Sequence, residues 1–231
     1  MKGKGTQAGF FQSQGSIRNL IFDLDGTLID SRLDIARSQA FAMKSRGFSS
    51  SEETFLPLAG QPLHVAFRNA RPDLDTLELE CLIGAYREHY REHALDTTVP
   101  FAGIREMLLE LHASGVGLAV ATTKGSAQAR QIIAGLNLLE MLDGVFGTDP
   151  PLRYKPEPDL LLHVLERQNW DADTAVAVGD AHTDMAAARA ARCRSGAALW
   201  GAHDRGRLLA ESPSFDFESP AEILDLVISR R

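Results

Sequence analysis

Two carboxylates placed two residues apart follow the short apolar run from Ile17 to Phe22, where the sequence reads DLDGTL from Asp23 to Leu28. The apolar run predicts a buried β-strand, and Gly26 then frees the backbone to turn. Side chains two positions apart in an extended segment leave on the same face. We therefore expect Asp23 and Asp25 to project together from the carboxyl edge of a sheet, where open α/β proteins bind their ligands.

The same residues could form an acidic turn without a function, because Asp-Gly favours turns. With average residue usage, however, the five fixed positions of the motif should occur by chance in roughly one chain in ten thousand of this length. The motif therefore favours a functional site over a simple turn.

Composition and charge limit what such a site can act on. The chain has 231 residues, 44% of them hydrophobic and 24% charged, which is ordinary for a globular protein. Its formal net charge of −7 argues against a general nucleic-acid-binding role. A metal and one lysine could still bind a small anionic substrate. Cys81 and Cys193 are isolated and the apolar runs are strand-sized, so we expect a reduced, cytoplasmic protein that does not span a membrane.

The chain divides by pattern into a leader, an α/β core and a helical insert. Residues 1–16 are rich in Gly, Gln and Ser and are expected to be a disordered leader. Residues 31–99 have helical apolar spacing broken by prolines, which predicts a domain of several short helices. Strand and helix patterns alternate in the remainder, so residues 17–30 and 100–231 are predicted to form a doubly wound (Rossmann-like) parallel sheet covered by helices on both faces. The strands are predicted at residues 17–22, 116–121, 144–147, 175–179 and 197–200.

Residues suited to binding an anion follow the later strands. Thr122 and Thr123 close the strand at residues 116–121 and precede free backbone N–H groups at a helix start, which is a favourable anion site. Thr123 could instead only cap that helix. Lys155 stands between a strand and a helix beside rigid prolines, a weak indication that its position matters, since a surface lysine is ordinarily just solvated.

A second pair of carboxylates follows the strand at residues 175–179. Asp180 ends that strand and Asp184 lies one helical turn later, so both can face one point above the sheet edge; each could instead stabilise a helix N-terminus. If they share one crevice with Asp23 and Asp25, like charges about 4 Å apart cost on the order of 4 kcal/mol per pair at an effective dielectric of about 20. A cation is therefore expected, and all-oxygen ligands favour Mg²⁺. The pattern predicts a magnesium-dependent phosphoryl centre.

The order of these motifs resembles that of the haloacid dehalogenase superfamily. The matching segments are DLDGTL, the strand that ends at Thr122, the Lys-Pro pair at Lys155, and GDAHTD from Gly179 to Asp184. The resemblance runs from about Arg18 to the C-terminus. Within it, the insert at residues 31–99 is similar to the helical cap domain of the phosphoglycolate phosphatase-like branch.

The resemblance implies a role for each residue of the motifs. Asp23 would be the nucleophile that forms an aspartyl-phosphate, and Asp25 would protonate the leaving oxygen and later deprotonate the attacking water. Thr122 and adjacent N–H groups would hold the phosphoryl oxygens, and Lys155 would neutralise charge between nucleophile and phosphate. The ligands of Mg²⁺ would be Asp23, the backbone carbonyl of Asp25, Asp180 and Asp184.

The resemblance also implies the kind of substrate. A helical cap restricts access, so we expect a small phosphorylated metabolite such as phosphoglycolate, an aryl phosphate or a sugar phosphate. Gly60 lies in a segment that resembles the substrate-specificity loop of the cap, and Arg68 is a candidate anion contact. Thr123 stands where many relatives carry Asn, which leaves its contact with phosphate open, and His182 is another uncommon choice. Monomer and homodimer are both open.

Four other functions can be compared with the motifs. A phosphomutase would share every motif and transfer the phosphoryl group to a second hydroxyl instead of water. A phosphonoacetaldehyde hydrolase needs a cap lysine, and Lys44 is the only lysine in the insert. Asp25 argues against that enzyme and against a dehalogenase, because both branches lack an acid/base Asp there. A non-catalytic binding protein on this fold would be expected to lose Asp23 or Asp25.

Overall fold

A single parallel sheet organises the part of the chain that carries the motifs. The computed structural model describes residues 16–201 and 204–228, so the leader expected at residues 1–16 lies outside it apart from its last residue. Within these residues the sheet has six strands in the order β5-β4-β1-β6-β7-β8, every neighbouring pair parallel. Its strands are β1 (Asn19–Phe22), β4 (Gly117–Thr122), β5 (Gly144–Gly147), β6 (Ala175–Gly179), β7 (Arg194–Ala198) and β8 (Phe215–Phe217). The predicted α/β fold is confirmed.

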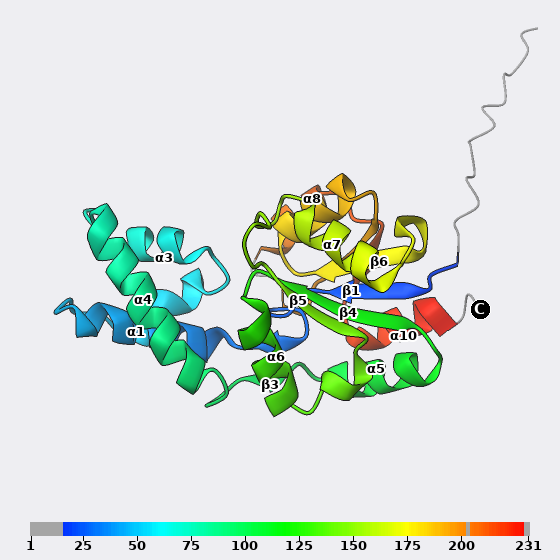
Figure 1. The fold of residues 1–231 in the computed structure, drawn as a ribbon, viewed down its shortest axis with the longest axis horizontal. Coiled ribbons are helices and arrows are strands. Elements are labelled where there is room, and N and C mark those ends of the chain that lie inside the picture. Colours follow the sequence, from blue (N-terminus) through cyan, green and yellow to red (C-terminus); the bar gives the residue numbers. More distant parts are fainter. Residues whose placement is uncertain (1–15, 202–203, 229–231) are drawn as a thin grey trace, which may run out of the picture.

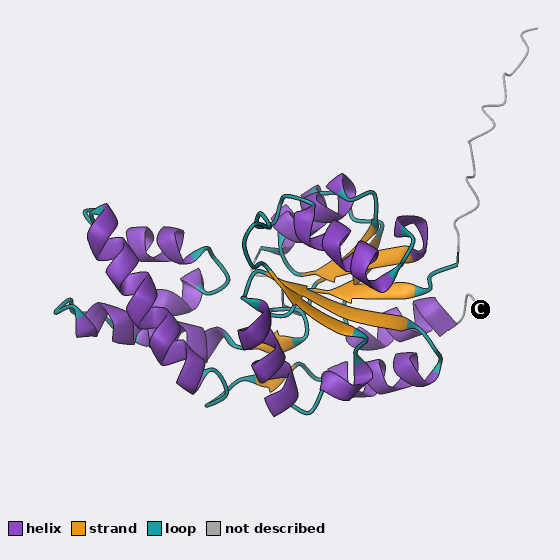
Figure 2. Cartoon of the chain, viewed as in Figure 1, coloured by secondary structure: helices purple, strands orange, loops and turns teal. Residues whose placement is uncertain are grey.

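Helices cover both faces of this sheet (Figures 1 and 2). On one face lie α5 (Ile104–Ala113), α6 (Ser126–Gly135) and α10 (Pro220–Ile228), and on the other lie α7 (Asp159–Gln168) and α8 (His182–Ala190). Alternate residues of β1 serve the two cores, because Leu20 and Phe22 pack on the first face while Ile21 packs on the second. This is why the central strands are apolar throughout. A short helix, α9 (Arg205–Ala210), packs beside α8.

The strand order reverses at β1. The chain continues from β4 outward to β5 on one side and from β6 outward to β7 and β8 on the other. Phe22, the last residue of β1, is level with Val120 of β4 and Val178 of β6. The segments that follow these three strands therefore meet at one point, which is where doubly wound sheets bind ligands.

The helices of residues 31–99 form a separate layer beside this edge of the sheet (Figure 1). They enter and leave through an antiparallel pair of short strands, β2 (Ile29–Asp30) and β3 (Val99–Pro100), which pattern alone did not predict. Prolines shape the helices as expected: one lies in the 3₁₀ helix η1, one caps α3, and one precedes α4. The helices are α1 (Arg32–Ser45), α2 (Glu52–Phe55), η1 (Leu56–Leu58), α3 (Leu63–Ala70) and α4 (Thr76–His93).

Helix α4 is the longest helix of this layer, and its start is specified by a capping motif in the sequence. Asp75 and Glu78 form a reciprocal capping box at its start, with Asp75 Oδ1 accepting from Glu78 N at 2.8 Å. Its buried residues are Leu79, Leu82, Tyr86 and Tyr90, spaced by three or four positions, and this face packs against α1. The same face brings its two tyrosines towards the sheet edge.

Two details differ from the strand prediction. Strand β7 begins at Arg194 and ends at Ala198, whereas the apolar pattern indicated residues 197–200. The polar residues Arg194 and Ser195 hid the start of this strand, and Trp200 lies in a turn beyond its end. Strand β8 was not expected, because its three residues at the sheet edge are too few to show a period. None of the described helices combines the length and apolar character needed to cross a membrane.

Asp34 joins the two connections between the helical layer and the core. Its side chain is 1% exposed. Its Oδ2 accepts from Thr97 N at 2.9 Å, from Thr98 N at 2.8 Å and from Thr98 Oγ1 at 2.8 Å, and its Oδ1 accepts from Thr97 Oγ1 at 2.6 Å. A carboxylate that receives four hydrogen bonds fixes the first turn of α1 to the segment that follows α4.

Replacing Asp34 with alanine should therefore destabilise the protein. The N–H and hydroxyl of the buried Thr98 and those of the neighbouring Thr97 would lose their acceptor, which predicts a loss of about 3 kcal/mol in the free energy of unfolding. Urea unfolding followed by circular dichroism measures this. Asp73→Ala is the matched control, because the Asp73 side chain is 70% exposed and pairs with Arg71 at the surface. Equal midpoints for the two variants would contradict the prediction.

Candidate active site

The segment after β1 makes a tight turn that is built around Gly26. This residue has φ of +85°, a conformation that favours glycine. A Cβ at this position would also overlap the carboxyl group of Asp180. The turn is closed by backbone hydrogen bonds from Leu28 N and Ile29 N to Leu24 O, at 2.9 and 3.1 Å. Gly26 thus lets the first motif approach the segment that follows β6.

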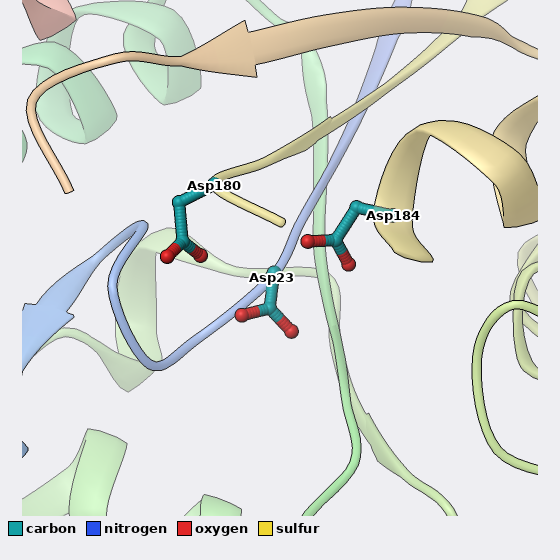
Figure 3. Close-up of side chains that lie close together, drawn as sticks. All are labelled: Asp23, Asp180 and Asp184. Atoms are coloured by element: carbon teal, nitrogen blue, oxygen red, sulfur yellow. The ribbon is translucent and has the colours of Figure 1, made fainter. Parts of the chain in front are cut away.

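Three carboxylates gather where β1 and β6 end (Figure 3). Asp23 follows β1, Asp180 follows β6, and Asp184 is the third residue of α8. One oxygen from each lies within 4.8 Å of the other two, which is close enough to share a metal ion. Because all three donors are carboxylate oxygens, the set suits a hard divalent cation such as Mg²⁺.

Lys155 supplies the positive charge of this cluster. Its Nζ donates to Asp23 Oδ1 at 2.7 Å, to Asp184 Oδ1 at 2.7 Å and to the carbonyl oxygen of Ala121 at 2.8 Å. All three N–H donors of the ammonium are thereby used. The Lys155 side chain is only 5% exposed, so these charge-assisted bonds lie in a poorly hydrated environment.

Burial changes the acidity of the carboxylates. Desolvation raises the pKa of Asp23 to about 7; Lys155 opposes this shift, and the charges of Asp184 and Asp25 add to it. Desolvation also raises the pKa of Asp180 well above its usual value, with further contributions from Asp23 and Asp184. One ammonium therefore does not balance the buried negative charge, and the remaining excess favours a bound cation.

The side chain of Asp25 lies outside this three-carboxylate cluster. Its Oδ2 accepts from Lys124 Nζ at 2.6 Å, and its Oδ1 accepts a short hydrogen bond from the hydroxyl of Ser31. The two carboxylates of the first motif thus have different lysine partners, although we expected them to crowd one point. The predicted metal contact of Asp25 was through its backbone carbonyl, and that stays a prediction.

The residues that close β4 occupy different environments. Thr122 is 1% exposed, and its Oγ1 accepts from Lys124 N at 3.2 Å, so the hydroxyl stabilises the turn after the strand. Thr123 is exposed at the same turn. Desolvation lowers the pKa of Lys124, but Asp25, Tyr86 and Asp23 together outweigh this effect, and the pKa is raised overall.

A second layer of contacts holds the carboxylates in place. Thr27 Oγ1 donates to Asp180 Oδ1 at 3.1 Å, and the indole Nε1 of Trp200 donates to the carbonyl of Thr27 at 3.0 Å. Asp184 Oδ2 accepts from Ala181 N at 3.0 Å, which also satisfies the start of α8. These contacts connect the turn after β1 with the segments after β6 and β7.

Comparison with known proteins decides the family. The model of the haloacid dehalogenase-like hydrolases matches residues 20–198, which include all four motifs. The chain belongs to this family. The inference from the motifs is confirmed.

Relatives and solved structures of the family span nearly the whole chain. A phosphoglycolate phosphatase of Aquifex aeolicus is 29% identical over 91% of this chain and 97% of its own length. A pyrophosphatase PpaX of Oceanobacillus iheyensis is 26% identical over 92% of this chain and 97% of its own. A haloacid dehalogenase-like hydrolase of Streptococcus pneumoniae superposes with a TM-score of 0.81 at 27% identity, over 90% of this chain and 97% of the other. The chain thus lies in the phosphoglycolate phosphatase-like branch.

Within this family fold, the two cap residues predicted to meet substrate stay predictions. Gly60 is exposed in the loop between η1 and α3, where its φ is +91°, and Arg68 is exposed on α3. Figure 1 shows that this loop lies on the side of the helical layer that is turned towards the sheet.

Motif reasoning missed several residues that contact the site. Ser31, Lys124 and Trp200 were visible in the sequence, but nothing in their spacing indicated contact with Asp25 or Thr27. The one available signal was the position of Lys124 directly after the two threonines that end β4. Tyr90 was harder still to predict from the sequence, because it belongs to the helical layer. Its ring centroid lies 4.8 Å from Lys124 Nζ.

The raised pKa of Asp180 predicts how stability depends on pH in the absence of divalent ions. An acid whose pKa is higher in the folded state keeps its proton longer there, so stability falls as pH rises from the unfolded pKa through the folded pKa. Asp180→Asn removes this penalty and keeps the oxygen that accepts from Thr27. In EDTA the variant should melt higher than the wild type at about pH 8, and the difference should shrink at about pH 5.

Differential scanning calorimetry measures these midpoints. The exposed Asp225 on α10 gives the control, since Asp225→Asn should shift no midpoint at either pH. Added Mg²⁺ should raise the midpoint of the wild type more than that of Asp180→Asn. If the difference in melting midpoint between wild type and Asp180→Asn did not vary with pH, the raised pKa of Asp180 would be contradicted.

Proposed function

We propose that this protein is a magnesium-dependent phosphatase that hydrolyses small phosphate monoesters through an aspartyl-phosphate. The observation that carries the proposal is the arrangement around Asp23. Its carboxylate is bound at 2.7 Å by the buried ammonium of Lys155 and lies beside the carboxylates of Asp180 and Asp184. Such a site presents an oxygen nucleophile together with the positive charge that a phosphoryl group requires.

In the first step, a carboxylate oxygen of Asp23 attacks phosphorus as the bond from phosphorus to the ester oxygen breaks. Asp25 donates a proton to that leaving oxygen, and the alcohol departs. In the second step, Asp25 takes a proton from water, whose oxygen attacks phosphorus while the bond to Asp23 breaks. Inorganic phosphate leaves, the Asp23 carboxylate is restored, and Asp25 has regained the proton that it gave to the alcohol. Lys155 would neutralise charge between Asp23 and the phosphoryl oxygens, and Thr122 with the N–H groups that follow it would orient them.

Asp23, Asp180 and Asp184, with the backbone carbonyl of Asp25, would hold Mg²⁺. The bound cation would neutralise phosphoryl charge during the displacement. The fit rests on the donor set: one buried and two half-buried carboxylates lie together, and the ammonium of Lys155 pairs with two of them, which leaves negative charge uncompensated.

The position of the helical layer is evidence that the substrate is small. We propose that residues 31–99 act as a cap domain over a core domain of residues 17–30 and 100–231. Its helices lie beside the edge where the carboxylates gather (Figure 1). Thr123, Gly60 and Arg68 would contribute contacts to a substrate under this cap. The relatives named phosphoglycolate phosphatase and pyrophosphatase favour a small phosphorylated metabolite.

The nucleophile is tested by Asp23→Asn. With phosphoglycolate or p-nitrophenyl phosphate and Mg²⁺, the wild type should release inorganic phosphate and the variant should not, because an amide oxygen is a poor nucleophile. Removing Mg²⁺ with EDTA should also stop phosphate release. Asp225→Asn serves as the control with an intact site. Turnover by Asp23→Asn at the wild-type rate would eliminate Asp23 as the nucleophile.

The acid/base role is tested by Asp25→Ala. Loss of a positioned general acid and base typically slows turnover about 10²- to 10⁴-fold. The loss should be smaller for p-nitrophenyl phosphate, whose leaving group needs little protonation. Phosphate release and transfer to an added sugar are measured together, because transfer in place of release would indicate a phosphomutase. Near-normal rates on an alkyl phosphate would refute the role.

A further inference from the structure

Lys124 is a buried cation whose hydrogen-bonding capacity is only partly used. Its side chain is 10% exposed, and its Nζ donates to Asp25 Oδ2 at 2.6 Å. Across residues 16–201 and 204–228, this ammonium makes no further hydrogen bond. An ammonium has three N–H donors, and burying donors without acceptors costs free energy. Lys155, in contrast, directs all three of its donors at acceptors.

The free donors of Lys124 lie on the leaving-group side of the site. This step rests on the proposed function, in which Asp25 protonates the leaving oxygen. That oxygen must then lie about 2.8 Å from the Asp25 carboxyl group. Lys124 Nζ is 2.6 Å from Oδ2 of this carboxyl group, so a leaving oxygen that bonds to Oδ2 lies within about 5 Å of the ammonium.

Two tyrosines of α4 enclose this position. The ring centroid of Tyr90 is 4.8 Å from Lys124 Nζ, and Tyr86 stacks on Tyr90 with 5.4 Å between centroids. Both rings are buried, at 0% exposure for Tyr90 and 7% for Tyr86. They restrict the space beside Lys124 and keep water away from it, which strengthens the attraction between the ammonium and an anion.

We propose that Lys124 is a specificity-determining residue that binds a second anionic group of the substrate, carried by the leaving group next to the scissile bond. A carboxylate one carbon away from an ester oxygen places its own oxygens roughly 3 Å from that oxygen, so such a carboxylate can reach hydrogen-bond distance of Nζ. The substrate class is a compact phosphate ester or anhydride whose leaving group is itself an anion. Phosphoglycolate and pyrophosphate have this property, and ethyl phosphate lacks it.

The test compares kcat/KM for these three substrates in wild type, Lys124→Met and Lys124→Arg. The methionine variant removes the charge and keeps the length of the side chain. We expect it to lose about 100-fold or more on the anionic substrates and no more than about 10-fold on ethyl phosphate. Lys124→Arg should retain the preference for an anionic leaving group. A greater loss on phosphoglycolate identifies a carboxylate site, and a greater loss on pyrophosphate identifies a phosphoryl site.

The control is Lys44→Met, because Lys44 is exposed on α1 and should affect none of the three substrates. Equal losses on all three substrates in Lys124→Met would overturn the proposal and leave Lys124 only as a partner that positions Asp25. Lys124→Met with a normal melting midpoint and unchanged ratios of kcat/KM between the anionic substrates and ethyl phosphate would overturn the proposal as well.

A binding measurement separates this inference from the proposed function. If the wild type hydrolyses none of the substrates, the proposed function fails. Isothermal titration calorimetry of phosphoglycolate and ethyl phosphate with Mg²⁺ then decides the inference by itself. Lys124→Met must weaken the binding of phosphoglycolate at least about 10-fold more than the binding of ethyl phosphate. An equal effect on both affinities overturns the inference.

Discussion

Lys155 makes the acidic centre of this protein compatible with a folded chain. Its ammonium donates to Asp23, to Asp184 and to the backbone of β4, so one buried charge connects β4 with the segments that follow β1 and β6. Without it, the carboxylates would repel one another in an environment that already raises the pKa of Asp23 and Asp180. The compensation is incomplete, because one ammonium faces three carboxylates. That imbalance is the physical reason why the site suits a divalent cation.

Two lysines divide the first motif between two chemical environments. Lys155 holds Asp23 within the three-carboxylate cluster, whereas Lys124 and Ser31 hold Asp25 on the side of the cap helices. The turn at Gly26 permits this separation of the two carboxylates. Without it, two neighbouring acids in one environment would compete for the same proton. The proposed nucleophile and the proposed acid/base group need different surroundings, and the contacts of the two carboxylates provide them.

Two contacts connect the helical layer with the core, one through Asp34 and one through Tyr90. Asp34 receives four hydrogen bonds from Thr97 and Thr98, which unites the two connecting segments. Tyr90 lies over Lys124, which places a cap residue directly beside the proposed leaving-group position. The position of the cap helices and the environment of Lys124 are therefore coupled, so movement of these helices would expose Lys124 and Asp25 to solvent together.

The sequence by itself determined the parallel sheet, the three strand ends that carry Asp23, Thr122 and Asp180, and the family. Continuous apolar runs specify buried strands, and parallel strands bring their carboxyl ends to one edge, so these features follow from local patterns. Short or polar strands escaped the same reasoning, as the start of β7 at Arg194 and all of β8 show.

Only the tertiary structure decided that Lys124 pairs with Asp25 and that Lys155 bonds Asp184 as well as Asp23. Lys124 lies 99 positions from Asp25, and Lys155 lies 132 positions from Asp23. Ion pairs across such separations depend on how helices pack against the sheet and on the rotamers that packing allows. No local periodicity encodes that geometry, because it arises only when the two faces of the sheet and the cap helices are assembled together.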